Sequence, residues 1–393
     1  MIPHNKICVL PWISLEATPH GAIRPCCLST TELPETVSDG LSTAYQSNTM
    51  VELRQAFRNK QKPAGCNRCW SEESAGRTSK RQWHLRKFSR QLDQVDWNSD
   101  HPDQLWFIDL KLGNICNLKC RICGTWSSSK WAQEEIAHQS LGNPKETQAY
   151  IQLKQGEWPR KTDTFWNDLE TLLPHVKYFE FTGGEPFLIK EHFDLLKRAV
   201  ELGHARNISI HYNTNGTTWP NTEAWKHFKN VEIAFSIDNI GNRFEIERSG
   251  ASWAEVQQNI SRAKELRTSV GNVVLQVCIT INIQNVLYLE DICNWVTAQE
   301  FNMVYFNMLH DPAHMNIANM TARAKELVIS RLQSALVEPR FQNEIDSVIK
   351  FIEQGTIGDG KKFVEFMKRT DTNRHEDFAQ THTEIAEAMG YGS

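Results

Sequence analysis

The sequence has no marked excess of charge of either sign, with 43 Lys and Arg residues against 47 Asp and Glu residues in 393. This balance gives no general reason to expect a nucleic-acid partner. The sequence also has no apolar run of eighteen residues, which excludes a membrane-spanning helix, and residues 1–6 lead into no signal-peptide core. We therefore expect a soluble, cytoplasmic protein with neither a membrane partner nor a nucleic-acid partner.

Cysteine, in contrast, occurs ten times. In a chain without an export signal, cysteines in this number indicate metal ligation rather than disulfides. Cys116, Cys120 and Cys123 form a C-x3-C-x2-C segment directly after a short apolar stretch. Iron–sulfur clusters normally take four cysteine ligands, so a set of three leaves one iron free to bind something else. The alternatives are three unrelated core cysteines or a zinc knuckle, which needs a further ligand pair that does not lie close in this sequence.

This spacing resembles the radical S-adenosylmethionine (SAM) superfamily, in which the free iron binds the amino and carboxylate groups of SAM. Three further motifs follow in the order of that superfamily: GGEP (residues 183–186), the TNG-like turn NTNG (residues 213–216) and S-x-D (residues 236–238). The resemblance covers residues 105–310. It implies an enzyme that holds a 4Fe–4S cluster with the three cysteines. Reduction of the cluster would cleave SAM to methionine and a 5′-deoxyadenosyl radical, which abstracts hydrogen from a substrate.

The resemblance also implies a set of SAM-binding residues. They are Gly183, Gly184, Glu185, Pro186, Asn213, Asn215, Ser236, Asp238 and Arg248. The glycines let the backbone approach the methionine amino group closely, and the polar residues after the later strands face the ribose or the carboxylate. Arg248 is similar to the family arginine that pairs with the SAM carboxylate, where a bidentate fork suits the geometry; a surface arginine is the alternative. No catalytic residue is assigned.

From residue 105 the pattern alternates between strand and helix, which is typical of a parallel sheet. Strands are predicted at 105–111, 176–181, 207–212, 231–237, 273–281 and 302–308, and helices near 126–139, 164–173, 191–202, 221–229, 252–268 and 286–298. Polar or glycine-rich clusters follow nearly every strand, as in α/β barrels, whose active sites lie at that end. An open doubly wound sheet is the alternative, but the resemblance implies an α/β partial (β/α)6 barrel of the radical SAM type, with a polar insertion at 140–162.

The segment before the barrel holds five more cysteines, which are Cys8, Cys26, Cys27, Cys66 and Cys69. Two β-prone runs around a Pro-His-Gly turn predict a hairpin between the first two, and residues 48–61 have a helical pattern. The helix is followed by a C-x2-C turn, so hairpin and turn together offer a four-cysteine site.

This arrangement resembles the twitch domain, a half-sized form of the SPASM auxiliary-cluster domain. The resemblance implies that Cys8, Cys26, Cys66 and Cys69 bind a second, auxiliary 4Fe–4S cluster. Twitch domains more often follow the barrel than precede it, and structural zinc also suits four cysteines. Cys27 either replaces Cys26 as a ligand or is buried.

The predicted domains are a twitch-like domain at 1–75, a basic linker helix at 76–104, the barrel at 105–310 and a helical extension at 311–393. The linker has six basic and no acidic residues between Arg77 and Arg90, with Trp83 and Phe88 among them. An RNA-binding patch is conceivable, but a solvated helix is favoured. In the extension, apolar stripes indicate packed helices. Its residues Asp371, Arg374 and His375 could reach a substrate pocket or form surface ion pairs.

Three functions follow from these patterns. The favoured one is a radical SAM oxidoreductase that abstracts hydrogen from a peptide or protein side chain, helped by the auxiliary cluster and served by a flavodoxin- or ferredoxin-type electron donor. The second is a radical SAM dehydrogenase or epimerase of a small molecule or nucleotide. The third is a non-catalytic iron–sulfur sensor or scaffold, which would not need the SAM-contacting residues.

Overall fold

The computed structural model of the chain describes residues 2–74, 78–138 and 143–392. It divides into two compact units. The first comprises Met1–Asn117, Thr125–Tyr212 and Pro220–Glu232, and the second Leu118–Gly124, Asn213–Trp219 and Ile233–Ser393. The predicted domain boundary between residues 75 and 76 lies outside the described residues, and so does Arg77 of the basic segment. Residue 139 of the predicted helix and residues 140–142 of the predicted insertion also lie outside them. The four predicted domains stay a prediction.

The first unit contains most of the helices of the N-terminal half. They are α1 (Leu10–Ile13), α2 (Leu41–Tyr45), α3 (Asn48–Arg58), α4 (Asn67–Ser74), α5 (Lys80–Lys87), α6 (Ser129–Ala137), α7 (Gln148–Gln155), α8 (Asp163–Leu172) and α9 (Lys190–Glu201). Its strands are β1 (Ser14–Ala17), β2 (Ile23–Arg24), β3 (Phe107–Lys111), β5 (Tyr178–Thr182) and most of β6 (Ser209–Thr214).

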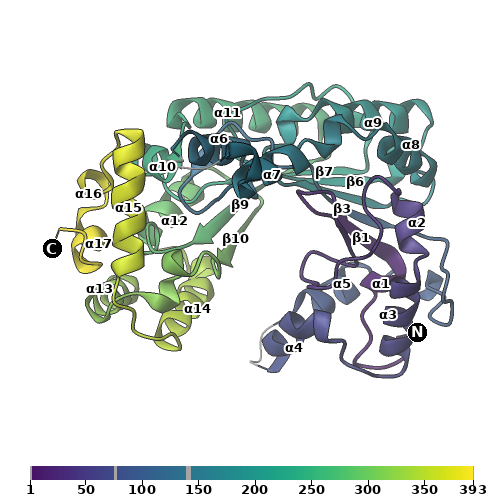
Figure 1. Cartoon of the computed structure of the whole chain (residues 1–393), viewed down its shortest axis with the longest axis horizontal. Coiled ribbons are helices and arrows are strands. Elements are labelled where there is room, and N and C mark those ends of the chain that lie inside the picture. The colour runs from purple at the N-terminus through teal and green to yellow at the C-terminus, as the bar shows by residue number, and fades with distance from the viewer. Residues whose placement is uncertain (1, 75–77, 139–142, 393) are drawn as a thin grey trace. The chain divides into compact units, whose positions relative to one another are not determined.

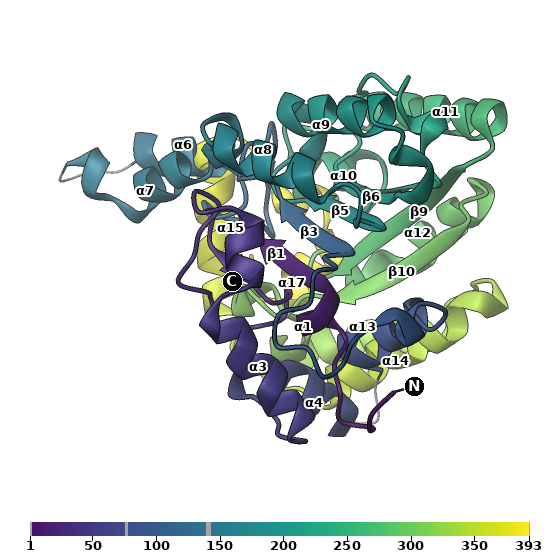
Figure 2. The same ribbon diagram turned by 90° about the vertical axis from the view of Figure 1, so that its right-hand side faces the viewer.

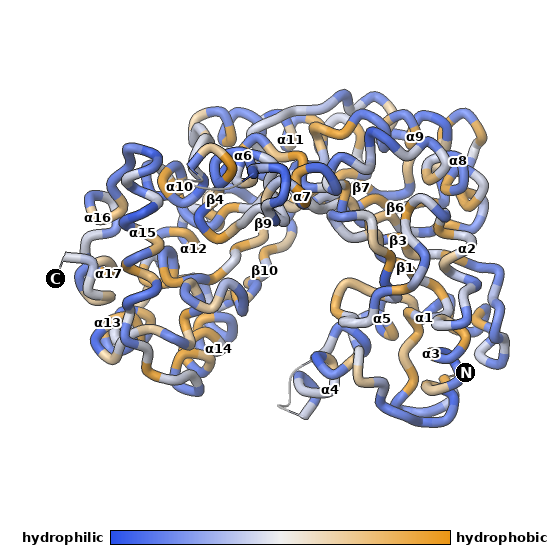
Figure 3. Tube along the Cα trace, in the orientation of Figure 1, coloured by the Kyte–Doolittle hydropathy of each residue, from blue (hydrophilic) through white to orange (hydrophobic). Residues whose placement is uncertain are grey.

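These strands are neighbours in the order β2-β1-β3-β5-β6. β1 runs antiparallel to β2, whereas β1, β3, β5 and β6 run parallel to one another. α8 and α9 cover one face of the sheet, and α5 lies on the opposite side (Figures 1 and 2). Along the helices hydrophilic and hydrophobic residues alternate (Figure 3). This mostly parallel sheet confirms the α/β class.

The second unit contains β4 (Lys119–Cys120), most of β7 (Asn230–Ser236), β8 (Arg248–Ser249), β9 (Val273–Ile281) and β10 (Met303–Met308). Its helices are α10 (Gly241–Glu247), α11 (Trp253–Val270), α12 (Leu289–Ala298), α13 (Ala322–Gln333), α14 (Gln342–Glu353), α15 (Lys361–Arg374), α16 (Phe378–Thr381) and α17 (Thr383–Ala388). β9 and β10 are parallel, and β4 and β8 form a separate antiparallel pair. No strand occurs in residues 311–392, as predicted.

All six strands predicted from residue 105 onward are present, but one predicted helix is wrong. In place of a helix at 221–229 there is a single 3-10 turn, Trp225–His227. Trp225 is fully buried and packs on Tyr212, and Phe228 already has extended backbone leading into β7. Burial of the indole and the short distance to the next strand therefore outweigh the helical pattern.

Two N-terminal predictions also need correction. The first β-prone run starts as helix α1 because Pro11 occupies its first turn, where its fixed φ favours a helix start; only the hairpin of β1 and β2 is confirmed. The helix expected in the basic segment is present as α5, but it is solvated on one side only. α5 buries Arg81 and His84; of the two aromatic residues of the conceivable RNA-binding patch, Phe88 is buried and Trp83 is exposed.

Candidate functional site

The four cysteines predicted to bind the auxiliary cluster line one small cavity of the first unit. They are Cys8 before α1, Cys26 after β2, Cys66 in the 3-10 turn before α4 and Cys69 on α4. Most of the remaining lining is apolar, including Phe57 and Trp70. By residue type, four thiols around an otherwise mostly apolar cavity match a four-thiolate ligand set. Their side chains are not arranged as such a set here: within the described residues, no group of three or more His, Cys, Asp or Glu side chains is placed to hold a metal ion.

Burial governs the protonation of these thiols. It raises the pKa of Cys26 to about 12 and that of Cys66 to about 11, and neighbouring thiols add to the rise. The pKa of Cys8 lies well above its ordinary value, again chiefly because of burial. Ligation of a metal centre here would therefore release protons from the thiols.

Cys27 has a different neighbour from Cys26. Lys80 Nζ on α5 donates to Cys27 Sγ at 2.8 Å, whereas Cys26 lines the cavity. Burial raises the pKa of the Cys27 thiol, with Lys80 opposing the rise. Cys27 is half-buried beside Lys80, and whether it or Cys26 acts as the ligand stays a prediction.

A row of ionisable side chains crosses the sheet of the first unit, and sequence analysis missed it. Glu16, Asp109, Glu180 and His211 are register partners on successive parallel strands, so they share one face of the sheet. Lys111, at the end of β3, forms ion pairs with Glu16 and with Asp109, at 3.5 Å from the latter. The signal for this row was an acidic or basic residue within each short strand, which a strand of a purely apolar core would not contain.

α5 supplies the positive charges that face this row. Lys80 Nζ lies 3.9 Å from Asp109. Lys87 stands over the Tyr178 ring, and burial lowers its pKa to about 8. Burial would raise the pKa of Glu180, but the surrounding cations, Lys80 first, lower it overall. The face therefore holds fixed charges of both signs in a buried setting.

A groove of about 740 Å³ opens at the C-terminal ends of β1 and β3. Arg24 and Lys111 line it, together with His20, Trp126 and Trp158. Arg24 forms a bidentate ion pair with the buried carboxylate of Glu16: Nε donates to Oε2 at 2.7 Å and Nη2 donates to Oε1 at 3.0 Å. The C-terminal ends of parallel strands are where α/β enzymes bind their ligands, so this groove has the position expected of a substrate site.

The GGEP segment follows β5 in the first unit and lies against the backbone that leads to Cys116. Glu185 N donates to Ile115 O at 2.8 Å. Glu185 is buried, and its carboxylate accepts from Phe187 N at 3.1 Å. The Cys116 backbone is in turn held by Ser129 Oγ, which lies 3.1 Å from Cys116 N. The structure thus brings Cys116 and the GGEP segment together.

The glycines are required at this contact. Gly184 has φ +45°, and a Cβ there would lie 2.3 Å from Ile115 O. Gly183 has φ +76°, and a Cβ there would lie 2.8 Å from the Lys111 Cα. Neither position leaves room for a side chain.

Gly184→Ala is expected to lower the free energy of unfolding by at least about 1–3 kcal/mol, the usual cost of a non-glycine residue in this backbone region. The clash with Ile115 O adds to that cost. Denaturant unfolding measures the effect. Gly271→Ala is the matched control, because Gly271 has φ +78° but no atom near its Cβ position. Equal losses of unfolding free energy in the two variants would show that the approach of Gly184 to Ile115 O is not close enough to exclude a side chain.

The second unit carries Cys120 and Cys123 with the S-x-D segment. The loop is tight, with Cys123 N donating to Cys120 O at 2.9 Å. Arg248 is the register partner of Cys120 across β4 and β8, and its Nη1 lies 3.8 Å from Cys120 Sγ. Arg248 is therefore not a surface arginine, which corrects the alternative reading.

Asp238 is the carboxylate partner of Arg248. Arg248 Nη2 donates to Asp238 Oδ2 at 2.6 Å, and Thr280 N donates to Asp238 Oδ1 at 2.8 Å. Burial would lower the pKa of Arg248, but Asp238 raises it overall, so the guanidinium is charged. Among the described residues, Arg248 Nε is a buried donor with no acceptor. An unsatisfied guanidinium donor beside Cys120 fits the binding of a carboxylate.

The remaining predicted SAM-binding residues also lie in the second unit. Asn213 Oδ1 accepts from Tyr305 OH at 3.1 Å. Asn215 Oδ1 accepts from Thr217 N and Oγ1 at 2.9 and 2.7 Å, which forms a local turn. Ser236 ends β7. Their roles toward SAM stay predictions.

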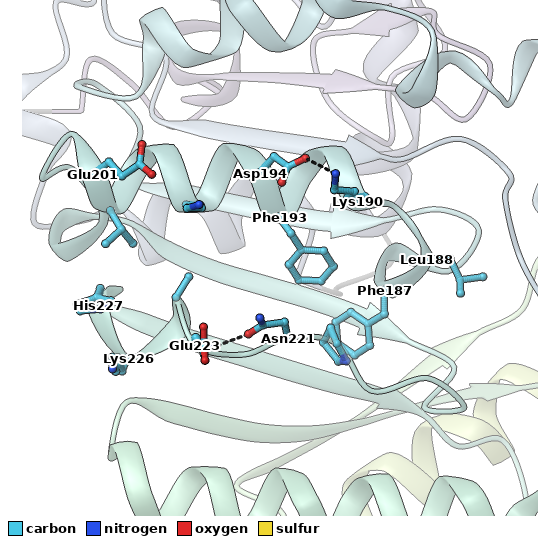
Figure 4. A pocket seen from close by; sticks show the side chains of 14 residues that line it. Phe187, Leu188, Lys190, Phe193, Asp194, Glu201, Asn221, Glu223, Lys226 and His227 are labelled. Carbon is cyan, nitrogen blue, oxygen red and sulfur yellow. Dashed lines mark hydrogen bonds and ion pairs between the residues drawn. The ribbon is translucent and has the colours of Figure 1, made fainter.

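A surface pocket of about 850 Å³ is lined by none of the cysteines predicted to bind a cluster. It lies in the first unit between α9 and the loop before β7, and is lined by Phe187, Phe193, Lys190 and Asn221 among others (Figure 4). The dashed contacts, Lys190 with Asp194 and Glu223 N with Asn221, lie among its own residues. Size alone therefore does not identify the functional site.

Comparison with known proteins gives one family match. Residues 110–296 match the Radical SAM superfamily, and no curated protein matches the sequence. Among solved structures, native anSMEcpe with bound AdoMet is 13% identical, with a TM-score of 0.36, and the match covers 64% of this chain and 62% of that one. The chain thus spans less than two thirds of that relative's length.

Two further structures are similar at comparable levels. Streptococcus suis SuiB bound to S-adenosylmethionine is 13% identical, with a TM-score of 0.33, and the match covers 88% of this chain and 70% of that one. TYW1 with a lysine-pyruvate adduct bound is 12% identical, with a TM-score of 0.30, and the match covers 59% of this chain and 72% of that one.

Proposed function

Starting from the radical SAM domain at residues 110–296, we propose that this chain is an enzyme that cleaves SAM reductively and abstracts hydrogen from a substrate. The observation that carries the proposal is the pairing of Arg248 with Asp238 beside Cys120. A scaffold that had lost SAM chemistry would not need a buried guanidinium with a spare donor at this position.

Cys116, Cys120 and Cys123 would hold a 4Fe–4S cluster, which supplies the electron that cleaves SAM when both are bound. The chain's own part is binding and orientation. Gly183 and Gly184 let the GGEP backbone pack against Lys111 and Ile115, the latter directly before Cys116. Arg248 offers its free donor to the carboxylate of SAM, and Asp238 holds the guanidinium in that orientation.

The substrate of the proposed reaction is a peptide or protein side chain. The support is the open groove at the ends of β1 and β3, with Arg24, Lys111 and His20 for polar contacts and the half-exposed Trp126 for an apolar one.

A small polar molecule or nucleotide is the second candidate, for a dehydrogenase or epimerase. The row from Glu16 to His211, faced by Lys80 and Lys111, offers buried charges of both signs. Such a face suits a ligand that carries several charges and no long apolar part.

The auxiliary cluster belongs to the same proposal, held by Cys8, Cys26, Cys66 and Cys69 around their common cavity. Its role would be to orient substrate or to accept an electron from it. A flavodoxin- or ferredoxin-type protein would supply the electron for SAM cleavage, and the location would be cytoplasmic. No helix in the described part of the chain has the length and apolar character to cross a bilayer.

Formation of 5′-deoxyadenosine tests the proposal. Anaerobically reconstituted protein, reduced with dithionite, is expected to convert SAM to 5′-deoxyadenosine and methionine, measured by chromatography with mass detection. Protein left unreduced is the control and is expected to form neither. Absence of product from the reduced, cluster-loaded protein would contradict the proposal. Peptide and metabolite pools added to the same reaction would reveal the substrate by mass change.

A further inference from the structure

Arg121 lies inside the cysteine loop, between Cys120 and Cys123, and is fully buried. Its backbone N donates to Glu247 O at 2.8 Å, and its Nε donates to Ile246 O at 3.1 Å. Both acceptors immediately precede Arg248. A buried guanidinium needs hydrogen-bond acceptors or carboxylate partners, because an unpaired charge in the interior is costly.

The partners come from α15 and from the short segment that follows it. Arg121 Nη2 donates to Glu376 Oε2 at 2.7 Å and to Asp371 Oδ1. Its Nη1 lies 3.2 Å from Met367 Sδ. A second contact holds the loop backbone, where Arg374 Nη1 donates to Lys119 O at 2.7 Å. Met367, Asp371 and Arg374 all belong to α15, the long C-terminal helix in Figure 1.

The two carboxylates are themselves fixed. Asp371 Oδ2 accepts from Phe378 N at 3.1 Å and from the Tyr391 hydroxyl. Glu376 Oε1 accepts from Ser249 Oγ on β8, beside Arg248. Arg121 therefore joins the cysteine loop to the end of α10, directly before Arg248, and to residues 371–376, and Glu376 extends this network to Ser249 on β8.

We propose that residues 361–376 form a clamp on the cysteine loop, with Arg121, Asp371 and Glu376 as positioning residues. The clamp holds Cys120 and Cys123 in fixed relation to Arg248, the residue proposed to bind the SAM carboxylate. This inference rests on the proposed function. It gives the C-terminal extension a role in SAM binding, because the contacts of Arg121, Asp371 and Glu376 add to the strand pair β4–β8 that joins the cysteine loop to the strand of Arg248.

The test compares SAM binding with fold stability in reconstituted full-length protein. Glu376→Gln and Asp371→Asn keep the side-chain shape and remove the charge, and Arg121→Lys keeps the charge but loses the fork. Glu384→Gln is the matched control, because it breaks the exposed Arg331–Glu384 ion pair of the same extension. The readouts are SAM affinity by equilibrium dialysis, the change that SAM causes in the EPR spectrum of the reduced protein, iron content and thermal unfolding.

The clamp predicts a loss of SAM affinity of about tenfold or more in the three variants, the usual effect of removing a residue that orients a ligand-binding group. The EPR change caused by SAM should be altered as well, and the control variant should behave like the wild type. Glu376 is the most exposed of the three side chains, so Glu376→Gln decides the question if another variant fails to fold.

Wild-type affinity and an unaltered EPR response in folded Glu376→Gln would overturn the clamp while leaving the proposed function intact. Equal loss of stability in all three variants without loss of SAM affinity would show a structural ion pair and would overturn it too. If the wild-type protein shows no EPR response to SAM, the proposed function fails, and the clamp fails with it.

Discussion

A variant with alanine at Cys116, Cys120 and Cys123 is expected to form no 5′-deoxyadenosine and yet to keep about four irons per chain. The substitutions remove all ligands of the SAM-cleaving cluster. They leave untouched the four thiols that line the N-terminal cavity. Product analysis, metal analysis and the broad charge-transfer absorption of an iron–sulfur cluster measure the two effects on one sample.

Cys293→Ala is the control for the loss of a buried thiol. Cys293 lies on α12 and is fully buried, so this variant should keep both clusters and the activity. Product formation in the triple variant equal to the wild type would refute the SAM-cleaving assignment. One zinc and negligible iron in the triple variant would show instead that the N-terminal site is structural.

Arg248→Ala is expected to lower the free energy of unfolding by about 3–5 kcal/mol, because it leaves the buried Asp238 carboxylate without its partner. Both side chains of this ion pair are less than one tenth exposed, at 8% and 2%. SAM affinity should also fall by about tenfold or more, the effect of losing a charge-assisted hydrogen bond. Asp238→Ala should weaken SAM binding as well, and the iron content should be unchanged in both.

Arg331→Ala provides the comparison, since it removes an arginine from an exposed ion pair with Glu384. Exposed pairs contribute about 0–1 kcal/mol, so this variant should unfold almost like the wild type. Denaturant unfolding and equilibrium dialysis give the two quantities. Normal SAM affinity in both Arg248→Ala and Asp238→Ala would remove these residues from the SAM site.

Much of the fold could be predicted because its signals are local. The alternation of apolar strands and helices from residue 105 predicted all six strands there, and β9 has the predicted bounds of 273–281. Where prediction failed, a contact distant in sequence was decisive. The pattern at 221–229 is helical, but burial of Trp225 against Tyr212 permits only one turn.

The site could be predicted in part for the same reason. Motif spacing located the cysteines and GGEP, since a close backbone approach of this kind requires glycine. The basic segment shows what composition alone could not predict. Its composition indicated solvent exposure, yet Lys80 faces Asp109 and Cys27. The number of charged residues in a segment does not show whether residues of opposite charge, here Asp109 on β3, will pack against them.

The sequence by itself determined the α/β class, the order of the strands along the chain and the residues that are candidates for holding iron and SAM. These follow from periodicity and spacing over a few residues, which backbone geometry translates directly into structure. Only the tertiary structure decided which charges meet. Arg121 and Asp371 are 250 positions apart, and the row from Glu16 to His211 arises from strand register. Such pairings depend on how distant segments pack, because a buried charge is stable only where the fold brings it a partner.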